Sequence, residues 1–198
     1  MKRKIPLHAS ISGLPPCGCA QDAATRIEPD GRAGFAHGDA RAADLHAVLV
    51  RPEIPHNTGA IGRTCVALGC DLALVKPLGF ALSDEYVRRA GLDYWQHLPL
   101  SVYDNWDDFL DRARPGRMHF LSTKGGRSIY DTTFEPGDTL LFGNENSGLP
   151  GPFYDRYRDA LVRIPMPGPH ARSLNLANAA SIALYEAFRQ IRGKCAAE

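Results

Sequence analysis

The sequence has few features that would suggest a membrane protein or a metalloprotein. No run approaches the roughly 18 apolar residues of a membrane span, and no apolar stretch follows the basic start of the chain, so we expect no secretory signal. The five cysteines form no CxxC pair and no zinc spacing, and none of the seven histidines is paired at ligand spacing. We therefore expect a cytoplasmic protein with reduced thiols, no bound metal and no membrane contact.

Several nucleotide-binding and hydrolase motifs are also missing. There is no GxxxxGK[ST], no GxGxxG after the first apolar run and no G-x-S-x-G. These absences exclude a P-loop ATPase or GTPase and the simplest dinucleotide-binding and hydrolase assignments. The formal net charge is only +1, so any binding to nucleic acid requires a local basic patch rather than a polycationic chain.

The composition is that of a folded chain with one main domain. The 198 residues are 44% apolar and 23% charged. Residues 1–44 are rich in Ala, Gly and Pro without helical or strand periodicity, which predicts a flexible extension. Residues 45–192 carry the ordered pattern, and residues 193–198 form a short tail.

Apolar runs alternate with amphipathic segments along the ordered part. This alternation predicts an α/β domain with a mostly parallel sheet. The expected strands cover residues 46–51, 71–75, 98–102, 117–122, 138–142 and 160–164. The expected helices cover residues 60–68, a short segment capped by Ser83, and residues 105–114, 152–159 and 174–191.

Three polar loops follow expected strands. The first leads into a helix that Asn57 or Thr58 can cap and Gly69 can end, with Arg63 in its first turns. The second places Glu145 between two glycines, which argues against a nucleotide triphosphate and for a ligand with hydroxyls or positive charge. The third is stiffened by prolines and ends in Ser173 and Asn175, which can cap the last helix or face a ligand. Turn and cap roles alone would also explain these loops.

Two groups of cations stand beside expected loops. Arg88 and Arg89 stand at the end of the short helix that is expected after Ser83. There they can pair with the helix dipole or contact phosphate. Lys124 and Arg127 flank a Gly pair, which suits a mobile loop that touches phosphate.

The three loops together resemble the ordered motifs of the SPOUT RNA methyltransferases. The motifs are PEIPHNTGAIGRTC from position 52, FGNENSGLP from position 142, and IPM from position 164 with SLNLAN from position 173. The stretch from Gly79 to Tyr94 resembles the small subfamily that methylates the ribose of the wobble nucleotide in certain leucine tRNAs. The resemblance covers about residues 46–191.

The resemblance implies a fold, a cofactor and a dimer. The fold would contain a deep C-terminal trefoil knot, an exception to the rule against knotted chains. The knot would hold S-adenosyl-L-methionine, and the enzyme would work as a homodimer through the knot region and the last helix. In that helix the small-residue face Leu176, Ala180, Ala183 and Ala187 allows close helix approach, although ordinary core packing would give the same pattern. The cofactor-binding residues would be Leu121, Gly143, Ile164, Met166, Ser173 and Leu174.

The resemblance also assigns roles in catalysis. Arg63 would activate or polarise the ribose hydroxyl, supported by Asn57, Glu145, Ser173 and Asn175. The phosphates of the tRNA anticodon stem-loop would be bound by the cations Arg88, Arg89, Lys124 and Arg127.

This chain departs from the subfamily pattern in two loops. Ser147 stands where the subfamily has an arginine, which removes that arginine from RNA contact, and the third loop is about one residue longer. Two other interpretations stay open at this point. One is methylation of another tRNA or rRNA ribose, and the other is a cofactor-binding RNA-interaction protein without turnover.

Overall fold

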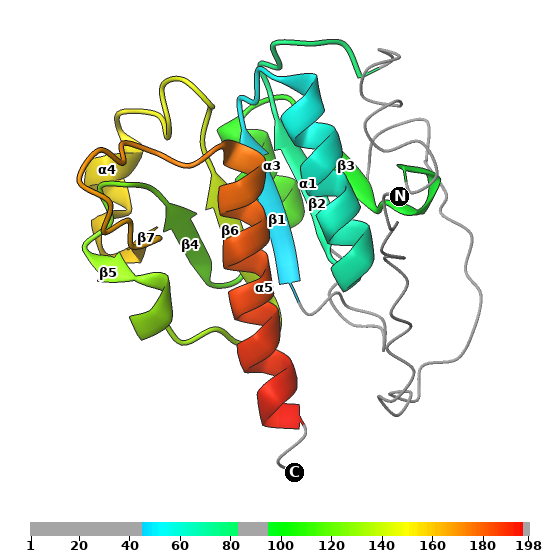
Figure 1. The fold of residues 1–198 in the computed structure, drawn as a ribbon. Coiled ribbons are helices and arrows are strands. Elements are labelled where there is room, and N and C mark those ends of the chain that lie inside the picture. Colours follow the sequence, from blue (N-terminus) through cyan, green and yellow to red (C-terminus); the bar gives the residue numbers. More distant parts are fainter. Residues whose placement is uncertain (1–44, 83–94, 196–198) are drawn as a thin grey trace, which may run out of the picture.

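A computed structural model describes residues 45–82 and 95–195. These residues contain a seven-stranded sheet in the order β3-β2-β1-β6-β4-β7-β5, in which every pair is parallel (Figure 1). The strands are β1 (Leu45–Val50), β2 (Asp71–Val75), β3 (Leu100–Tyr103), β4 (Met118–Leu121), β5 (Arg127–Ser128), β6 (Asp138–Phe142) and β7 (Leu161–Arg163). The predicted α/β class with a parallel sheet is confirmed.

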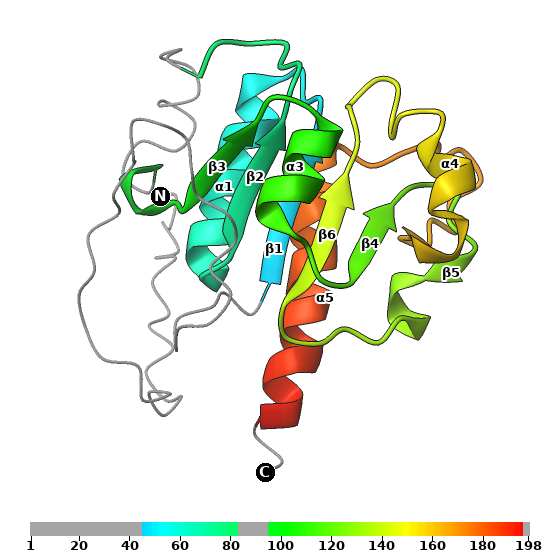
Figure 2. The ribbon, with the colours of Figure 1, turned by 180° about the vertical axis from the view of Figure 1, so that it is seen from behind.

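Helices cover both faces of the sheet. α1 (Pro55–Leu68) and α5 (Leu176–Cys195) lie side by side on one face, and α3 (Trp106–Ala113) lies on the other, as the two opposite views show (Figures 1 and 2). α4 (Phe153–Arg156) follows β6, and short 3-10 turns occupy Trp95–His97, Ile129–Asp131 and Arg158–Ala160.

Alternate residues of the strands supply two separate cores. In β1, Leu45, Ala47 and Leu49 pack toward α1 and α5, whereas Val48 and Val50 pack toward α3. All six residues of β1 are buried, as expected for a central strand of a parallel sheet covered on both faces.

The small-residue face of α5 belongs to the first of these cores. Ala180, Ala183 and Ala187 are fully buried within the chain, in the cluster that contains Ile61 of α1. The small residues thus let α5 pack closely against α1 and the sheet, which is the core packing that their spacing also allows.

Most element boundaries agree with the expected ones, and two differ for physical reasons. α1 begins at Pro55, so Asn57 and Thr58 lie inside its first turn and neither caps it. The two-residue strand β5 was not expected, because it forms only by pairing with β7. The helix expected after Ser83, with Arg88 and Arg89, lies outside the described residues.

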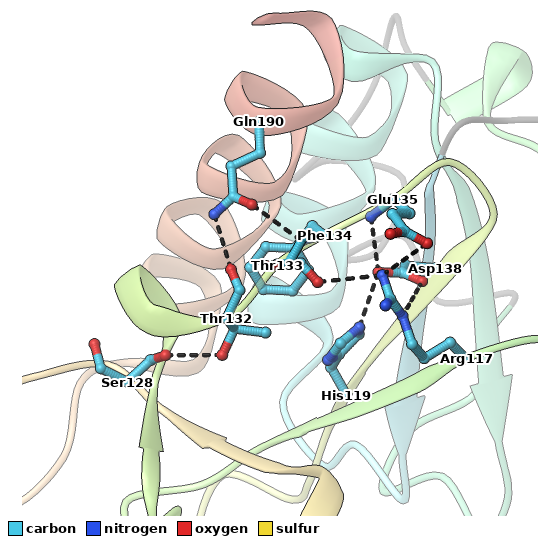
Figure 3. A network of polar contacts seen from close by, with 9 residues as sticks. All are labelled: Arg117, His119, Ser128, Thr132, Thr133, Phe134, Glu135, Asp138 and Gln190. Carbon is cyan, nitrogen blue, oxygen red and sulfur yellow. Dashed lines mark hydrogen bonds and ion pairs between the residues drawn. The ribbon is translucent and has the colours of Figure 1, made fainter. Parts of the chain in front are cut away.

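A polar cluster at the amino end of the sheet secures the far end of α5 (Figure 3). Asp138, at the start of β6, accepts hydrogen bonds from Arg117 at 2.9 and 2.8 Å and lies 2.9 Å from Nε2 of His119. Gln190 of α5 donates to the carbonyl of Thr132 and accepts from the amide of Phe134, both at 3.0 Å. This cluster lies at the edge opposite to the polar loops.

The chain order places a ligand crevice at the centre of the sheet. The next two strands of the chain, β2 and β3, lie on one side of β1. The later strands lie on the other side, and β6 is the one directly next to β1. In open parallel sheets, ligands bind outside the carboxyl ends of the strands at such a switch point. The loops that follow β1 and β6 meet there.

Candidate active site

A pocket of about 280 Å³ opens at the carboxyl ends of β4 and β6. Its walls come from residues 121–124, from residues 142–149 and from the loop between β7 and α5. That loop runs from β7 across to the start of α5 (Figure 1). Three segments that are distant in sequence therefore enclose one site.

The β6 loop is a tight turn that requires glycine at position 143. A Cβ atom built on Gly143 would lie 2.2 Å from the carbonyl carbon of Gly148, far inside van der Waals contact. The amide and carbonyl groups of Asn144 and Gly148 exchange hydrogen bonds of 2.9 Å across the turn. Gly148 itself has a φ of 72°, in the region that favours glycine.

Asn144 fixes this turn and joins it to the end of β1. Its side-chain oxygen accepts from the amides of Asn146 and Ser147 at 2.8 and 3.0 Å, and its Nδ2 donates to the carbonyl of Arg51 at 2.9 Å. Asn144 is buried and its partners are exposed residues, so these bonds are partly shielded from water.

Glu145 supplies the cap that α1 lacks from its own sequence. Its two carboxylate oxygens accept from the amides of Glu53 at 2.9 Å and Ile54 at 3.1 Å. α1 has no acidic residue in its first turn and no side-chain cap of its own, so a carboxylate from the β6 loop satisfies these donors and complements the helix dipole. Glu145 was expected to face a ligand, but both of its carboxylate oxygens accept hydrogen bonds from the protein.

A chain of side-chain amides continues from Glu145 to the last helix. Nδ2 of Asn57 donates to Oε1 of Glu145, and Nδ2 of Asn175 donates to Oδ1 of Asn57, each at 3.1 Å. Oδ1 of Asn175 then accepts from the amides of Ala177 and Asn178 at 2.9 and 3.3 Å. The acceptor-only carboxylate at one end and donor-only amides at the other fix both asparagine orientations.

Asn175 performs the capping role that the sequence allowed and makes a contact that the sequence did not reveal. It caps α5 and also binds a residue from another polar loop. The structure brings together Glu145, Asn57 and Asn175, which are three of the five residues predicted for catalysis.

The pocket also gathers all the residues predicted to bind the cofactor. Glu145 and Ser173 line it as well, so Ser173 belongs to this wall rather than to the amide chain. The predicted cofactor residues found in its lining are Leu121, Gly143, Ile164, Met166, Ser173 and Leu174.

Arg63 does not line this pocket. It lies beyond Asn57 on α1 with its side chain exposed to solvent. The next residue, Thr64, lies 3.0 Å from the hydroxyl of Ser181, on the side of α1 that meets α5.

Lys124 and Arg127 line a neighbouring groove of about 810 Å³. Lys124 and Tyr154 border both this groove and the smaller pocket, and the Lys124 ammonium lies 4.5 Å from the centre of the Tyr154 ring. Arg158 and Arg163 add two further cations to the groove.

The first glycine of the pair in this region lies where two backbones come close together. Gly125 is buried, and a Cβ there would lie 2.5 Å from the carbonyl carbon of Val162. Arg127 follows directly in β5, which pairs with β7. Gly125 therefore permits close packing of two backbones, whereas a Cβ at Gly126 would meet no atom within 4 Å, and the mobility of this loop stays a prediction.

Sequence reasoning missed several residues of the site. Asn144 carried a usable signal, since an Asn after a strand and before a turn commonly bonds the backbone two residues on. No such sequence signal marks Tyr154, Arg158 and Arg163. They come close to Lys124 only because β4, β5 and β7 pair in the sheet.

The described residues contain neither a membrane-spanning helix nor a cluster of metal-ligating side chains. Within residues 45–82 and 95–195, no helix is long and apolar enough to cross a membrane. In the same ranges, no three His, Cys, Asp or Glu side chains gather where they would hold a metal ion.

The parallel sheet, the switch-point pocket and the Gly-rich and Pro-rich loops define a SPOUT-type methyltransferase fold. Residues 44–185 match the model of the SpoU rRNA Methylase family. The chain belongs to this family.

Similar proteins within the family act on RNA. A tRNA (cytidine(34)-2'-O)-methyltransferase of Saccharophagus degradans is 47% identical over 148 residues, which cover 74% of this chain and 96% of that protein. A solved structure concerned with 2-OH methylation of C/U34 on tRNA has a TM-score of 0.72 and 49% identity, covering 75% of this chain and 97% of the other. An AdoMet-bound rRNA methyltransferase of Sinorhizobium meliloti has a TM-score of 0.68 and 31% identity, and the match covers 83% of this chain and 61% of that chain.

Proposed function

We propose that this protein is an S-adenosyl-L-methionine-dependent tRNA methyltransferase that modifies the ribose 2′-hydroxyl of wobble nucleotide 34. The observation that carries the proposal is the hydrogen-bonded chain Glu145–Asn57–Asn175, which ties the three motif loops together beside one pocket. Similar proteins at 47% and 49% identity are named for this reaction.

The residues of the pocket fit the cofactor. Its lining combines apolar side chains such as Leu121, Ile164 and Met166 with the backbone of the Gly143 turn. A ligand with a purine ring, a ribose and an amino-acid end requires that mixture of apolar walls and backbone polar groups. The trefoil knot expected for the family would hold these loops in place.

The bound cofactor supplies a methyl group on a positively charged sulfur, which is a good leaving group. Transfer breaks the carbon–sulfur bond, forms a carbon–oxygen bond to the ribose and releases the hydroxyl proton. The chain must therefore hold the ribose in line and manage that proton. Orientation of this kind supplies roughly 7–11 kcal/mol of barrier reduction in favourable cases.

Arg63 acts on the ribose hydroxyl by charge. A guanidinium stays protonated in proteins, so it is a poor base, but it stabilises the alkoxide charge that develops on the oxygen. The proton passes to a phosphate or another acceptor. Asn57, Glu145, Ser173 and Asn175 hold the surrounding loops and are positioning residues.

The active form is a homodimer. Two observations support it: Arg63 lines no pocket described here in its own chain, and α5 exposes Ile182 and Tyr185 at 38% and 52%. Packing through this exposed face, rather than through the buried alanines, would cover apolar side chains and bring a second α1 near the site.

The partner is the anticodon stem-loop of a tRNA, and leucine tRNAs are the proposed substrates. Lys124 and Arg127 contact its phosphates from the charged groove. Arg88 and Arg89 are proposed for the same role, although they lie outside the described residues. Such a substrate places the protein in the cytoplasm.

A second candidate is methylation of another tRNA or rRNA ribose, favoured by the similarity to rRNA methyltransferases at 31% identity. The test is incubation with methyl-labelled cofactor and either total tRNA or ribosomal RNA, each lacking ribose methylation. Label in tRNA at nucleotide 34 supports the proposal. Label only in ribosomal RNA overturns it, and cofactor binding without label in either RNA would indicate a binding protein without turnover.

A further inference from the structure

A second pocket, of about 320 Å³, lies on the other side of the β6 loop, and we call it the rear pocket. Asn144, Ser147 and Gly148 line both the rear pocket and the cofactor pocket, so the β6 turn separates the two. The other residues that line the rear pocket are Arg51, Glu53, Pro77, Leu78, Gly79 and Pro150. The roles assigned so far do not use this pocket.

Arg51 brings an unpaired positive charge to the rear pocket. Its side chain is exposed, and in the described part of the chain no hydrogen bond or ion pair engages its guanidinium. Glu53 lines the same pocket without pairing with it, and Oε2 of Glu53 accepts from Nδ2 of Asn146 at 2.7 Å. The N–H donors of the Arg51 guanidinium are therefore available to an anionic ligand.

The backbone of Arg51 is held in an unfavourable conformation at the end of β1. Its φ is 56°, in the left-handed region that few residues other than glycine adopt. Its amide donates to the carbonyl of Val75 and its carbonyl accepts from Nδ2 of Asn144, both at 2.9 Å. Strain that surrounding bonds enforce in this way is concentrated at ligand sites.

No second cation shares the rear pocket. Ser147 stands on its wall at the position where the resembling subfamily has an arginine. Among the described residues that line the pocket, Arg51 is therefore the only one with a positive charge. A single guanidinium in a small pocket fits a single phosphate group, which it can bind through two oxygens at once.

The rear pocket and the charged groove border different walls of the cofactor pocket. The groove meets the cofactor pocket at Lys124 and Tyr154, whereas the rear pocket meets it at the β6 turn. A nucleotide whose 2′-hydroxyl reaches the methyl donor carries a phosphate on each side, so its backbone continues past the donor in two directions. Cations on two walls of the cofactor pocket match this course of the RNA.

We propose that the rear pocket binds one of the two phosphates that flank the methylated nucleotide, through the guanidinium of Arg51. This inference rests on the proposed function. A phosphate contact holds the RNA in place without reading its sequence, so the pocket favours neither C nor U at position 34. The much larger groove around Lys124 and Arg127 is left for the phosphates of the stem.

Glu53 makes the sign of the ligand's charge testable. Its carboxylate lines the same pocket and repels an anion, so Glu53→Gln should strengthen the binding of a phosphate. Arg51→Gln should weaken it. A ligand group that donates hydrogen bonds to the carboxylate would instead bind more weakly to Glu53→Gln, so opposite effects of the two variants indicate an anion.

The experiment measures the affinity of the enzyme for an anticodon stem-loop by fluorescence anisotropy, with S-adenosylhomocysteine bound so that no methyl transfer occurs. Arg51→Gln is expected to weaken binding roughly fivefold. It should also reduce the slope of log affinity against log salt concentration by about 0.7, the contribution of one phosphate contact in single-stranded RNA. Arg189→Gln is the charge-matched control, because Arg189 is exposed and lies near the carboxyl end of α5.

Two further RNAs test which phosphate Arg51 contacts. Each carries one neutral methylphosphonate, on the 5′ or on the 3′ side of nucleotide 34. One of them should bind the wild type and Arg189→Gln more weakly than the unmodified RNA does. The same substitution should cause no further loss in Arg51→Gln, because that variant has already lost the charge that the phosphate would contact.

Each outcome has a distinct meaning. If both methylphosphonates weaken the wild type and Arg51→Gln equally, or weaken neither, Arg51 contacts no flanking phosphate and the inference is overturned. Weaker RNA binding by Glu53→Gln also overturns it, because the pocket would then need the carboxylate. Methylation by the wild type is measured in parallel with S-adenosyl-L-methionine. No methyl group at nucleotide 34 would overturn the proposed function itself.

Discussion

Glu145 and Asn57 are 88 residues apart in sequence and meet through a hydrogen bond of 3.1 Å. The bond joins the loop after β6 to the first turn of α1, and Asn175 extends it to α5. A single carboxylate thus organises the three loops that form the candidate active site.

Replacing Asn57 by Asp should be more harmful than replacing it by Ala. Asp would place a second carboxylate against Glu145 and remove the donor, leaving buried groups unsatisfied at a cost of about 1–3 kcal/mol. The free energy of unfolding from urea titration, together with cofactor affinity from calorimetry, measures both effects. Wild-type stability and affinity in Asn57→Asp would contradict the described network.

Gly143→Ala should abolish cofactor binding. The new methyl would lie 2.2 Å from a backbone carbon of Gly148, so the turn that lines the pocket must open. Gly151→Ala is the matched control, because a Cβ there meets no atom within 4 Å. Calorimetric titration with the cofactor compares the two, and equal affinities would show that the turn does not shape the site.

Arg63→Ala should reduce kcat by about 10²–10³-fold, the loss seen when one charge-stabilising donor is removed. The cofactor affinity should stay near the wild-type value, since Arg63 is exposed and is not among the residues that line the candidate cofactor pocket. Single-turnover kinetics with saturating RNA separates these quantities. A loss of cofactor affinity as large as the loss of turnover would assign Arg63 to binding instead.

Asp138 should make folding stability depend on acid pH. Burial alone would raise its pKa, but hydrogen bonds from His119, Arg117 and the Glu135 amide bring the pKa below its usual value. A carboxylate with a lowered pKa stabilises the fold above the unfolded value of about 3.9, and this stabilisation is lost as the pH falls through the folded value.

Asp138→Asn should therefore be less stable than the wild type by about 3 kcal/mol near neutral pH, because it leaves charged partners uncompensated. The difference should shrink as the pH falls below about 4, because the carboxylate of the unfolded chain then takes up a proton while the native one, with its lowered pKa, does so only at lower pH. Urea unfolding at several pH values measures it. A constant difference from pH 7 to pH 3 would contradict the assigned ionisation.

The sequence predicted those features that depend on local pattern. The apolar runs at 71–75 and 138–142 are strands with the predicted bounds, and Gly69 ends α1 with a φ of 69°. Residues of the second and third motifs that resemble SPOUT enzymes also line one pocket, because each of these motifs follows a strand of the same parallel sheet.

The failures concern partners that no local pattern reveals. Asn57 does not cap its helix, because Glu145 from a distant loop does so. Gly125 packs against β7, and the alanines of α5 pack against their own core. In each case the residue type allowed more than one structural role. A contact with a residue distant in the sequence determines which role it has.

The most direct test of the proposed activity is methyl transfer to an anticodon stem-loop with cytidine at position 34, compared with the same RNA carrying 2′-deoxycytidine there. Mass spectrometry of nuclease fragments locates the methyl group. We predict one methyl on the ribose of nucleotide 34, and none on the deoxy RNA or with Arg63→Ala. A methyl group on the deoxy RNA, on the base or at another nucleotide would contradict ribose methylation at position 34.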